Sequence, residues 1–281
     1  MLNLSTLLAF ASALALIVFL GAAPALALSP VTYVSGTGAN TGICASPAAP
    51  CRSFQFAHNQ TSAGGEIKAL DSANYGPVTI TKSISITGIE GAGVFRAAGS
   101  AAITINAGPG DTINLSHLTL DGFNKTAVSG ILLNSGGSLT ITHCSVRNFK
   151  TTGIGVLPTG NTVFLIADVA VSDAATGIFV NPQGTGSAHG TLDHVSVNKN
   201  TNGIFILGNS AALSVESTAT NDGVGFLLSS GAVLRLAHSS ATGNDTGVFV
   251  PAGTTAESAG NNFIRGNTTD VVGTLTNVGT Q

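Results

Sequence analysis

Charged side chains are scarce in this chain of 281 residues, and tryptophan is absent from it. Asp, Glu, Lys and Arg together make up 8% of the sequence, against about a quarter in an ordinary globular domain. Long surface helices stabilised by Glu–Lys pairs are therefore not expected. The net charge of −3 offers no electrostatic attraction to nucleic acid or to an acidic membrane, so we expect neither as a partner.

Glycine and small polar residues take the place of the missing charges. The sequence has 36 glycines and is rich in Ser, Thr, Asn, Val and Ile. Glycine and asparagine favour turns, whereas threonine, valine and isoleucine favour strands. The composition therefore predicts a protein of many short strands and tight turns.

The first 27 residues have the pattern of a secretory signal peptide. Residues 7–20 are almost wholly apolar, residues 21–24 end the run, and Ala25 and Ala27 are the small side chains that signal peptidase accepts. We expect a signal peptide at 1–27, cleaved after Ala27, and a mature chain that is secreted, extracellular or periplasmic. A retained anchor is the alternative, because the segment before the run has no Lys or Arg, but the run is short for a membrane span. No later segment is long and apolar enough to span a bilayer.

The chain has three cysteines. Cys44 and Cys51 flank a proline-rich loop, and an oxidising compartment would join them in a disulfide. A metal-binding pair is the alternative, but no His or Cys lies immediately beside them in the sequence. Cys144 lies in a segment of alternating residues and is expected to be a buried, unreactive thiol.

A four-residue pattern recurs six times: Gly, an aliphatic residue or Phe, any residue, and an aliphatic residue. Its glycines, spaced 22–26 residues apart, are Gly130, Gly153, Gly177, Gly203, Gly225 and Gly247. Segments of alternating apolar residues lie between the copies, at 113–120, 139–146, 192–197 and 234–241. Because alternation with a period of two predicts a strand, each unit of about two dozen residues should contain three short strands and three turns.

Turns this short leave no room for helices, so each strand must stack on the equivalent strand of the next unit, ~4.8 Å away. Such a parallel β-helix buries the apolar side chains of each coil against its neighbours, and no coil is stable alone. The patterns resemble those of the right-handed parallel β-helix, or pectin-lyase-like, superfamily over about residues 75–272. The resemblance implies an all-β fold, a single-stranded right-handed solenoid.

Both ends of a solenoid need protection, because an open end exposes core and strand edges. We assign residues 28–74 to an N-terminal cap, in which 52–61 forms a short helix with Phe54 and Ala57 on helical spacing. The Tyr-Val-Ser-Gly at 33–36, the Pro-Cys at 50–51 and the Gly-Gly-Glu-Ile at 64–67 resemble the entry segment of bacterial exported β-helix proteins. Residues 261–267 are expected in a partial last coil, and 273–281 in a polar C-terminal tail.

Stacked coils convert a sequence position into a column of side chains. One column, just after the second strand of each unit, has the members His117, His143, Asp168, His194, Ser217 and His238. His and Asp are among the non-glycine residues that best tolerate a positive φ, so this column is expected to form a structural turn ladder at a tight bend. A metal site is the alternative, but ligands in a straight line do not close around an ion.

A second column occupies the third position of the glycine pattern: Leu132, Gly155, Phe179, Phe205, Leu227 and Phe249. Its neighbours along each strand are apolar and expected inside, so the column should face outward as an apolar stripe. We predict a binding surface at Phe179, Phe205, Leu227 and Phe249. Polar loop residues are expected to rim it: Asp173, Asn181, Lys199, Asn202, Asp222, Asn244 and Asp245. The alternative is that a loop or the C-terminal tail covers the stripe.

Catalysis has weaker support in the sequence. Lyases of the related superfamily need clustered carboxylates for calcium and a basic side chain, for which Asp173, Asp222 and Asp245, with Arg147, Lys150 or Lys199, are the candidates. The Asp-Asp and Arg-Ile-Lys motifs of the related hydrolases are absent. A glycosidase carboxylate pair is conceivable only at Asp193 and Glu216, on adjacent coils beside the turn ladder.

The sequence thus favours an exported, non-catalytic β-helix protein that binds a polysaccharide or another cell-surface component. Two alternatives remain open. One is a polysaccharide lyase or glycoside hydrolase with divergent motifs, in which calcium would be a cofactor; otherwise no cofactor or metal is expected. The other is a structural protein that associates with itself through the stripe or through the ends of the coil, and the oligomeric state is left open.

Overall fold

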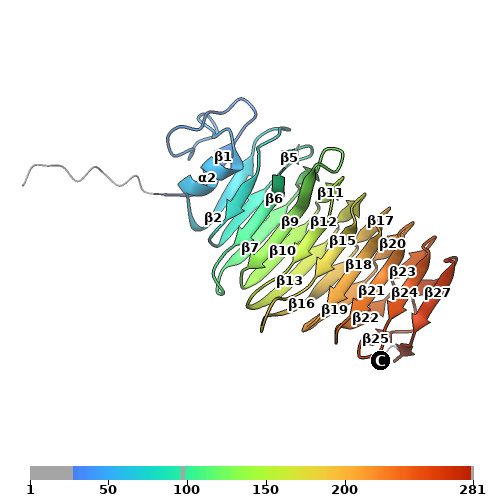
Figure 1. The fold of residues 1–281 in the computed structure, drawn as a ribbon. Helices are drawn as coiled ribbons and strands as arrows, with labels where there is room; N and C mark the ends of the chain where they lie inside the picture. Colours follow the sequence, from blue (N-terminus) through green and yellow to red (C-terminus); the bar gives the residue numbers. More distant parts are fainter. Residues whose placement is uncertain (1–27, 96–98, 280–281) are drawn as a thin grey trace, which may run out of the picture.

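The computed structural model describes residues 28–95 and 99–279. They form a right-handed solenoid of parallel strands, about eight coils long (Figure 1). The predicted fold class is therefore confirmed. The expected signal peptide at 1–27 lies outside the described residues. Among the described residues, no helix has the length and apolar character needed to cross a bilayer.

Three parallel sheets form the walls of the solenoid, and each complete coil from β4 onward contributes one strand to each sheet. Sheet A consists of β1 (Ser29–Val34), β2 (Thr61–Ala69), β4 (Ile84–Thr87), β7 (Thr112–Ser116), β10 (Ser138–Thr142), β13 (Asn161–Ala167), β16 (Ser187–Asp193), β19 (Ser210–Val215), β22 (Val233–Ala237), β25 (Thr255–Ser258) and β28 (Leu275–Asn277). Sheet B consists of β5 (Gly93–Phe95), β8 (Thr119–Asp121), β11 (Ser145–Arg147), β14 (Ala170–Ser172), β17 (Ser196–Asn198), β20 (Thr218–Thr220), β23 (Ser240–Thr242) and β26 (Phe263–Ile264). Sheet C consists of β3 (Val78–Ile80), β6 (Gly99–Asn106), β9 (Ala127–Ser135), β12 (Thr152–Val156), β15 (Thr176–Val180), β18 (Asn202–Leu207), β21 (Val224–Ser229), β24 (Thr246–Val250) and β27 (Thr269–Gly273).

The hydrophobic core is a continuous column inside the coils. In sheet C, Ile131, Ile154, Ile178 and Ile204 are register partners on consecutive strands, and all four are fully buried. Because side chains alternate along a strand, the residues between these isoleucines and the next inward residues face away from the core. The apolar repeat in the sequence is therefore the inner lining of sheet C.

The recurring glycine of the repeat allows consecutive coils to approach one another. A Cβ atom on Gly177 would lie 2.6 Å from the carbonyl oxygen of Gly203, and one on Gly203 would lie 2.6 Å from the carbonyl oxygen of Gly225. Neither glycine needs a positive φ. The repeat thus requires glycine because the backbone of the next coil occupies the space of a side chain.

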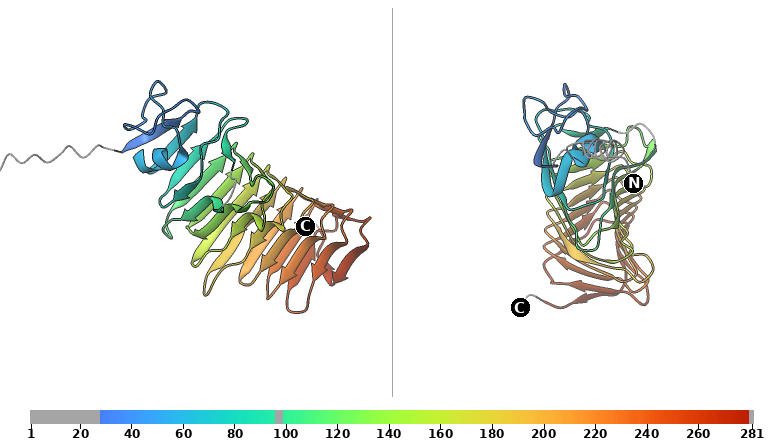
Figure 2. Two further views of the ribbon diagram at one scale, coloured as in Figure 1. Left: turned by 45° about the horizontal axis from the view of Figure 1, so that its top comes forward. Right: turned by 90° about the vertical axis from the view of Figure 1, so that its left-hand side faces the viewer.

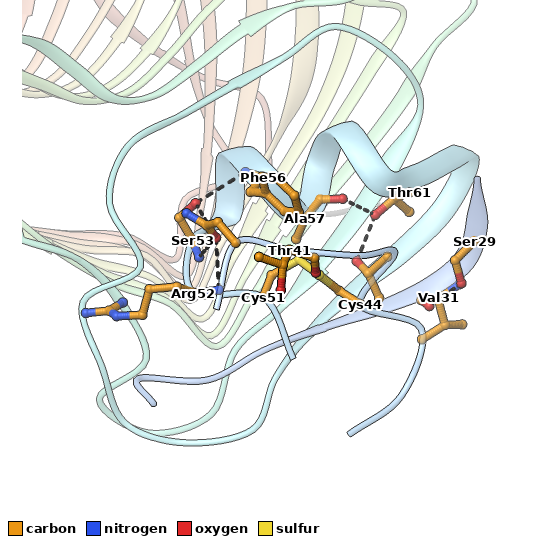
Figure 3. The surroundings of a disulfide bond; sticks show 12 residues. Ser29, Val31, Thr41, Cys44, Cys51, Arg52, Ser53, Phe56, Ala57 and Thr61 are labelled. Carbon is orange, nitrogen blue, oxygen red and sulfur yellow. Dashed lines mark hydrogen bonds between the residues drawn. A yellow bond between two sulfur atoms is a disulfide. The ribbon is translucent and has the colours of Figure 1, made fainter. Parts of the chain in front are cut away.

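A short helix covers the N-terminal end of the solenoid, as predicted. Helix α2 (Phe54–Gln60) begins after Ser53, whose hydroxyl accepts a hydrogen bond from the backbone N–H of Phe56 at 3.3 Å (Figure 3). Phe54 and Ala57 are fully buried, and the Phe54 ring lies 4.8 Å from that of Tyr75. The helix therefore seals the core with the residues that its sequence places on one face. Figure 2 shows it at the N-terminal end of the stacked coils.

The predicted disulfide is present beside this helix. Cys44 and Cys51 are bonded, with 5.4 Å between their Cα atoms, and both are buried (Figure 3). Cys51 also exchanges backbone hydrogen bonds with Tyr33 and Ser35 around β1. Cys144 is a buried free thiol, and burial raises its pKa to about 11. A thiol with so high a pKa is unreactive at neutral pH.

The solenoid extends beyond the limits expected for it at both ends. Strand β2 already pairs with β4 in sheet A, so the first coil begins within the expected cap segment. At the other end, residues 275–277, expected within a polar tail, form β28 and pair with β25. Two hydrophobic side chains near this end, Phe263 and Val278, are more than half exposed.

Candidate functional site

The predicted stripe is a continuous column on the outer face of sheet C. Register pairing joins the successive members, which are Leu132, Gly155, Phe179, Phe205, Leu227 and Phe249. The column continues to Val272 on β27, which is exposed. All of these strands are parallel and hydrogen-bonded, so the stripe is attached to a rigid sheet.

The aromatic members of the stripe are partly open to solvent. Phe179 and Phe205 are half-buried, and their ring centroids lie 5.3 Å apart with a tilt of 38°. The flanking residues Ile178 and Val180 are fully buried, which fixes the outward direction of Phe179. The C-terminal residues 275–277 lie in sheet A, so they do not cover the stripe.

One gap in the stripe is filled by a residue that the sequence reasoning missed. Gly155 has no side chain and is buried, but a Cβ atom at that position would lie 2.8 Å from Cδ1 of Leu157 and 3.1 Å from Cδ1 of Leu132. Leu157 therefore covers the Gly155 position and makes the apolar surface continuous. Its outward direction follows from its place two residues after Gly155, a signal that was available in the sequence.

Polar residues border the stripe on both sides. Asp173 and Lys199 have left-handed φ angles of 58° and 57° at the corners that lead from sheet B into β15 and β18. Asp245 is exposed two residues after the equivalent corner of a later coil, and Asn181 and Asn202 are half-buried at the ends of sheet C strands. These side chains offer charges and hydrogen-bonding groups next to the aromatic surface.

Two residues expected on this rim are buried instead. Asp222 and Asn244 are 4% and 3% exposed. Each follows a corner residue with a left-handed φ, Asn221 or Gly243, and this bend turns the next side chain into the interior. The prediction that Asp222 and Asn244 line the binding surface is therefore wrong.

The turn ladder lies at the corner between sheets A and B. All five of its predicted histidine and aspartate members have φ between 48° and 56°: His117, His143, Asp168, His194 and His238. The sixth position is Glu216, with φ 47°, and not Ser217, which is fully buried. The displacement arises because β19 turns Leu213 outward and buries Ser214, the reverse of what their polarity suggests.

Neighbouring rungs of this ladder interact with one another. The His117 and His143 rings are stacked, with centroids 4.8 Å apart and planes 2° from parallel. His143 Nε2 lies 3.6 Å from Asp168 Oδ2. With Glu90, these three side chains line part of a hollow of about 380 Å³.

His194 lies between two carboxylates. Its Nδ1 is 2.7 Å from Asp193 Oδ1, and its Nε2 is 2.7 Å from Glu216 Oε2. The hydrogen bond with Asp193, together with the charges of Asp193 and Glu216, holds the pKa of His194 above its ordinary value. Asp193 and Glu216, the carboxylate pair considered for glycoside hydrolysis, therefore both contact the imidazole of His194.

The candidate calcium ligands do not form a cluster. Asp173 is at an outer corner, Asp222 is inside the solenoid and Asp245 is exposed on a different coil. No group of three or more His, Cys, Asp or Glu side chains within 28–95 and 99–279 is arranged to hold a metal ion. Arg147, one of the candidate bases, is 2.9 Å from Asp121 through its Nε.

Comparison with known protein families gives a match to part of the chain. A family model described as a right-handed beta helix region matches residues 129–274, just over half of the chain. No curated protein and no solved structure matches the chain significantly. The matched region contains the aromatic stripe and most of the turn ladder.

Proposed function

Since the chain belongs to the right-handed β-helix family, we propose that it is an exported protein that binds an extended polysaccharide along the stripe of sheet C. The observation that carries this proposal is the outward column of Phe179, Phe205, Leu227 and Phe249 on consecutive hydrogen-bonded strands. A row of apolar side chains facing solvent marks an interaction site. The rigid sheet holds the row in place before any ligand arrives, which limits the entropy lost on binding.

The geometry of the stripe suits a polymer of rings. Equivalent side chains recur at the strand spacing of ~4.8 Å, so a chain of similar units running along the solenoid axis would meet a similar surface at each coil. Aromatic rings provide large, rigid contact areas for the apolar faces of sugar rings. Asp173, Lys199 and Asn181 could then accept or donate hydrogen bonds to hydroxyl groups at the edges.

The electrostatics support binding rather than cleavage. Catalytic acids and bases need shifted pKa values near the substrate. Within the described part of the chain, the carboxyl group with a clearly raised pKa is that of Asp222, and it is buried behind the sheet. The pKa values of Asp71, Asp111, Asp121 and Asp270 are lowered, which keeps these carboxyl groups ionised rather than ready to donate a proton.

Export is supported by the cap. The Cys44–Cys51 disulfide is a bond that persists in oxidising compartments and is rare in the cytosol. Together with the signal peptide expected at 1–27, this bond supports the proposal that the ligand lies outside the cytoplasm.

The test is binding to a panel of polysaccharides that includes polygalacturonate and alginate, measured by affinity electrophoresis and calorimetry. The variant Phe179→Ser/Phe205→Ser/Phe249→Ser should lose binding while its circular dichroism stays that of the folded protein. The matched control is Val163→Ser/Leu165→Ser/Leu213→Ser, which removes three exposed hydrophobic side chains from the outer face of sheet A. This control should bind as the wild type does.

Two results would contradict the proposal. The first is unchanged polysaccharide binding after removal of the three phenylalanines. The second is ultraviolet absorbance of unsaturated products when wild-type protein is incubated with the polymers and calcium, which would identify a lyase instead.

Self-association is a second candidate, favoured by the exposed Phe263 and Val278 near the end of the last described coil. An open strand edge beside exposed apolar side chains can pair with another chain. Light scattering decides between the two functions. A molar mass that rises with protein concentration would support assembly, and a monomer at all concentrations would count against it.

A further inference from the structure

A column of polar side chains runs inside the solenoid, next to the corner between sheets B and C. Its members are Asn200, Asp222, Asn244 and Asn267, each one residue after a corner residue with a positive φ. They belong to consecutive coils, because the strands before them, β17, β20, β23 and β26, are neighbours in sheet B. Figure 1 labels the first three of these strands in succession along the solenoid. Asn200, Asp222 and Asn244 are 3–5% exposed.

One side-chain oxygen of each member of this interior ladder accepts a hydrogen bond from the backbone of the coil before it. The N–H of Asn200 donates to Asp222 Oδ1 at 2.7 Å, and that of Asp222 donates to Asn244 Oδ1 at 2.8 Å. The N–H of Asn244 likewise donates to Asn267 Oδ1 at 3.0 Å. One oxygen per side chain is thus used in the same way at every rung.

In Asn244 and Asn267 the side-chain amide nitrogen is also used in a repeated way. Asn244 Nδ2 donates to the carbonyl oxygen of Ala219 at 3.0 Å, and Asn267 Nδ2 donates to that of Ala241 at 2.9 Å. Ala219 and Ala241 are register partners in sheet B. By the same register, the acceptor for the side chain at position 222 is the carbonyl oxygen of Val197, the partner of Ala219.

Asp222 departs from this pattern at its second oxygen. Its Oδ1 accepts from both the N–H and Nδ2 of Asn200, at 2.7 and 3.0 Å. Its Oδ2 is the one buried side-chain nitrogen or oxygen without a hydrogen-bond partner in residues 28–95 and 99–279. An ionised carboxylate there would direct a lone pair at the Val197 carbonyl, whereas a neutral acid has a proton to donate.

We infer that, in the folded protein at mildly acidic pH, Asp222 is a neutral carboxylic acid whose Oδ2–H donates to the Val197 carbonyl, in the place where Asn244 and Asn267 use Nδ2–H. Its ionisation at higher pH loosens the solenoid at this coil. A buried polar atom without a partner is costly, and an unpaired buried charge is costlier. The inference does not depend on which ligand the stripe binds.

The surroundings favour the neutral form. Burial raises the pKa of Asp222 to about 6, and the hydrogen bonds from Asn200 oppose that rise only in part. The groups in contact with the carboxyl are uncharged: the backbone N–H and the side-chain amide of Asn200, and the backbone at Gly203, where a Cβ atom would lie 2.6 Å from Oδ2. The charged residues nearest to the corner on the neighbouring coils, Lys199 and Asp245, are exposed.

The direction of the pH effect follows from linkage. The folded state holds a proton on Asp222 at pH values between the ordinary aspartate pKa of 3.8 and the folded pKa of about 6, where the unfolded state has lost it. The free energy of unfolding is therefore greatest below pH 3.8, the pKa of the unfolded state, and falls as the pH rises from 3.8 to about 6. At higher pH, Asp222 causes no further change in stability.

The test compares Asp222→Asn with wild type by thermal unfolding across this pH range. Asparagine has the amide that the ladder uses, so the variant should fold, melt at a higher temperature than wild type at neutral pH, and lose the difference at pH values below the window. Asp245→Asn is the control for removing an exposed carboxylate from the same corner, and it should leave the melting temperature unchanged.

A second measurement follows the titration of the carboxyl group itself rather than the stability of the protein. Carbon-13 NMR of the aspartate carboxyl groups in the wild-type protein should show one resonance, absent from Asp222→Asn, that titrates near pH 6. Titration of that resonance at an ordinary aspartate pKa would overturn the inference. So would an Asp222→Asn variant that is less stable than wild type at neutral pH or that fails to fold.

Discussion

Replacement of Gly177 by alanine tests whether the coils are as close as the repeat implies. The added Cβ atom would lie 2.6 Å from the carbonyl oxygen of Gly203, 3.1 Å from Asn200 Nδ2 and 3.3 Å from Asn200 Cγ. The nearest of these atoms is backbone in a hydrogen-bonded strand, so the contact can be relieved only by separating two coils. Forcing an extra carbon into a packed interior destabilises a protein by about 1–3 kcal/mol. Alanine also restricts the unfolded chain more than glycine does, which offsets this loss by about 0.4–1 kcal/mol.

The matched control is Gly160→Ala, because a Cβ atom at Gly160 meets nothing within 4 Å and φ there is not positive. We expect Gly177→Ala to be less stable than Gly160→Ala by about 1–3 kcal/mol, measured by urea unfolding followed with circular dichroism. Equal stability of the two variants would refute the reasoning, because it would mean that the next coil does not occupy the space beside Gly177.

Two further predictions concern the core and the cap. Ile204→Ala should destabilise the protein by about 2–5 kcal/mol, since Ile204 is fully buried. Leu213 is 38% exposed and faces outward, so Leu213→Ala should change the free energy of unfolding by less than about 1 kcal/mol. Similar losses of stability from both variants in urea titrations would argue against the assigned faces. Cys44→Ser should lower the free energy of unfolding by about 2–3 kcal/mol, because the disulfide no longer closes a short loop. The variant should also be more susceptible to limited proteolysis in the cap. An unchanged digestion pattern would show that the disulfide does not stabilise the cap.

The solenoid and its outward stripe were predictable because they depend on periodicity alone. A glycine pattern every 22–26 residues fixes the coil length, and alternation then fixes the direction of Phe179 and Phe205. The short helix was predictable for a similar reason, since Phe54 and Ala57 share a helical face. In each case the local pattern and the tertiary contacts agree.

The errors in the sequence interpretation lie at corners and at one atypical strand. Asp222 and Asn244 look like surface loop residues, but the left-handed residue before each of them turns the side chain inward, where the ladder satisfies its polar atoms. Ser217 was assigned to the turn ladder in place of Glu216 because β19 buries Ser214 and exposes Leu213. Polarity alone gives the wrong face there, and only the register with β16 corrects it.

The most direct test of the stacked coils is cross-linking between residues that are far apart in sequence. Leu165 and Thr191 are register partners on β13 and β16, and Leu213 is the partner of Thr191 on β19. Cysteines introduced as Leu165→Cys and Thr191→Cys should form a disulfide on mild oxidation, because adjacent strands place them within disulfide reach. The pair Leu165→Cys and Leu213→Cys, two coils apart, should not. Efficient cross-linking of the second pair, or none of the first, would contradict the parallel register on which the stripe and both ladders depend.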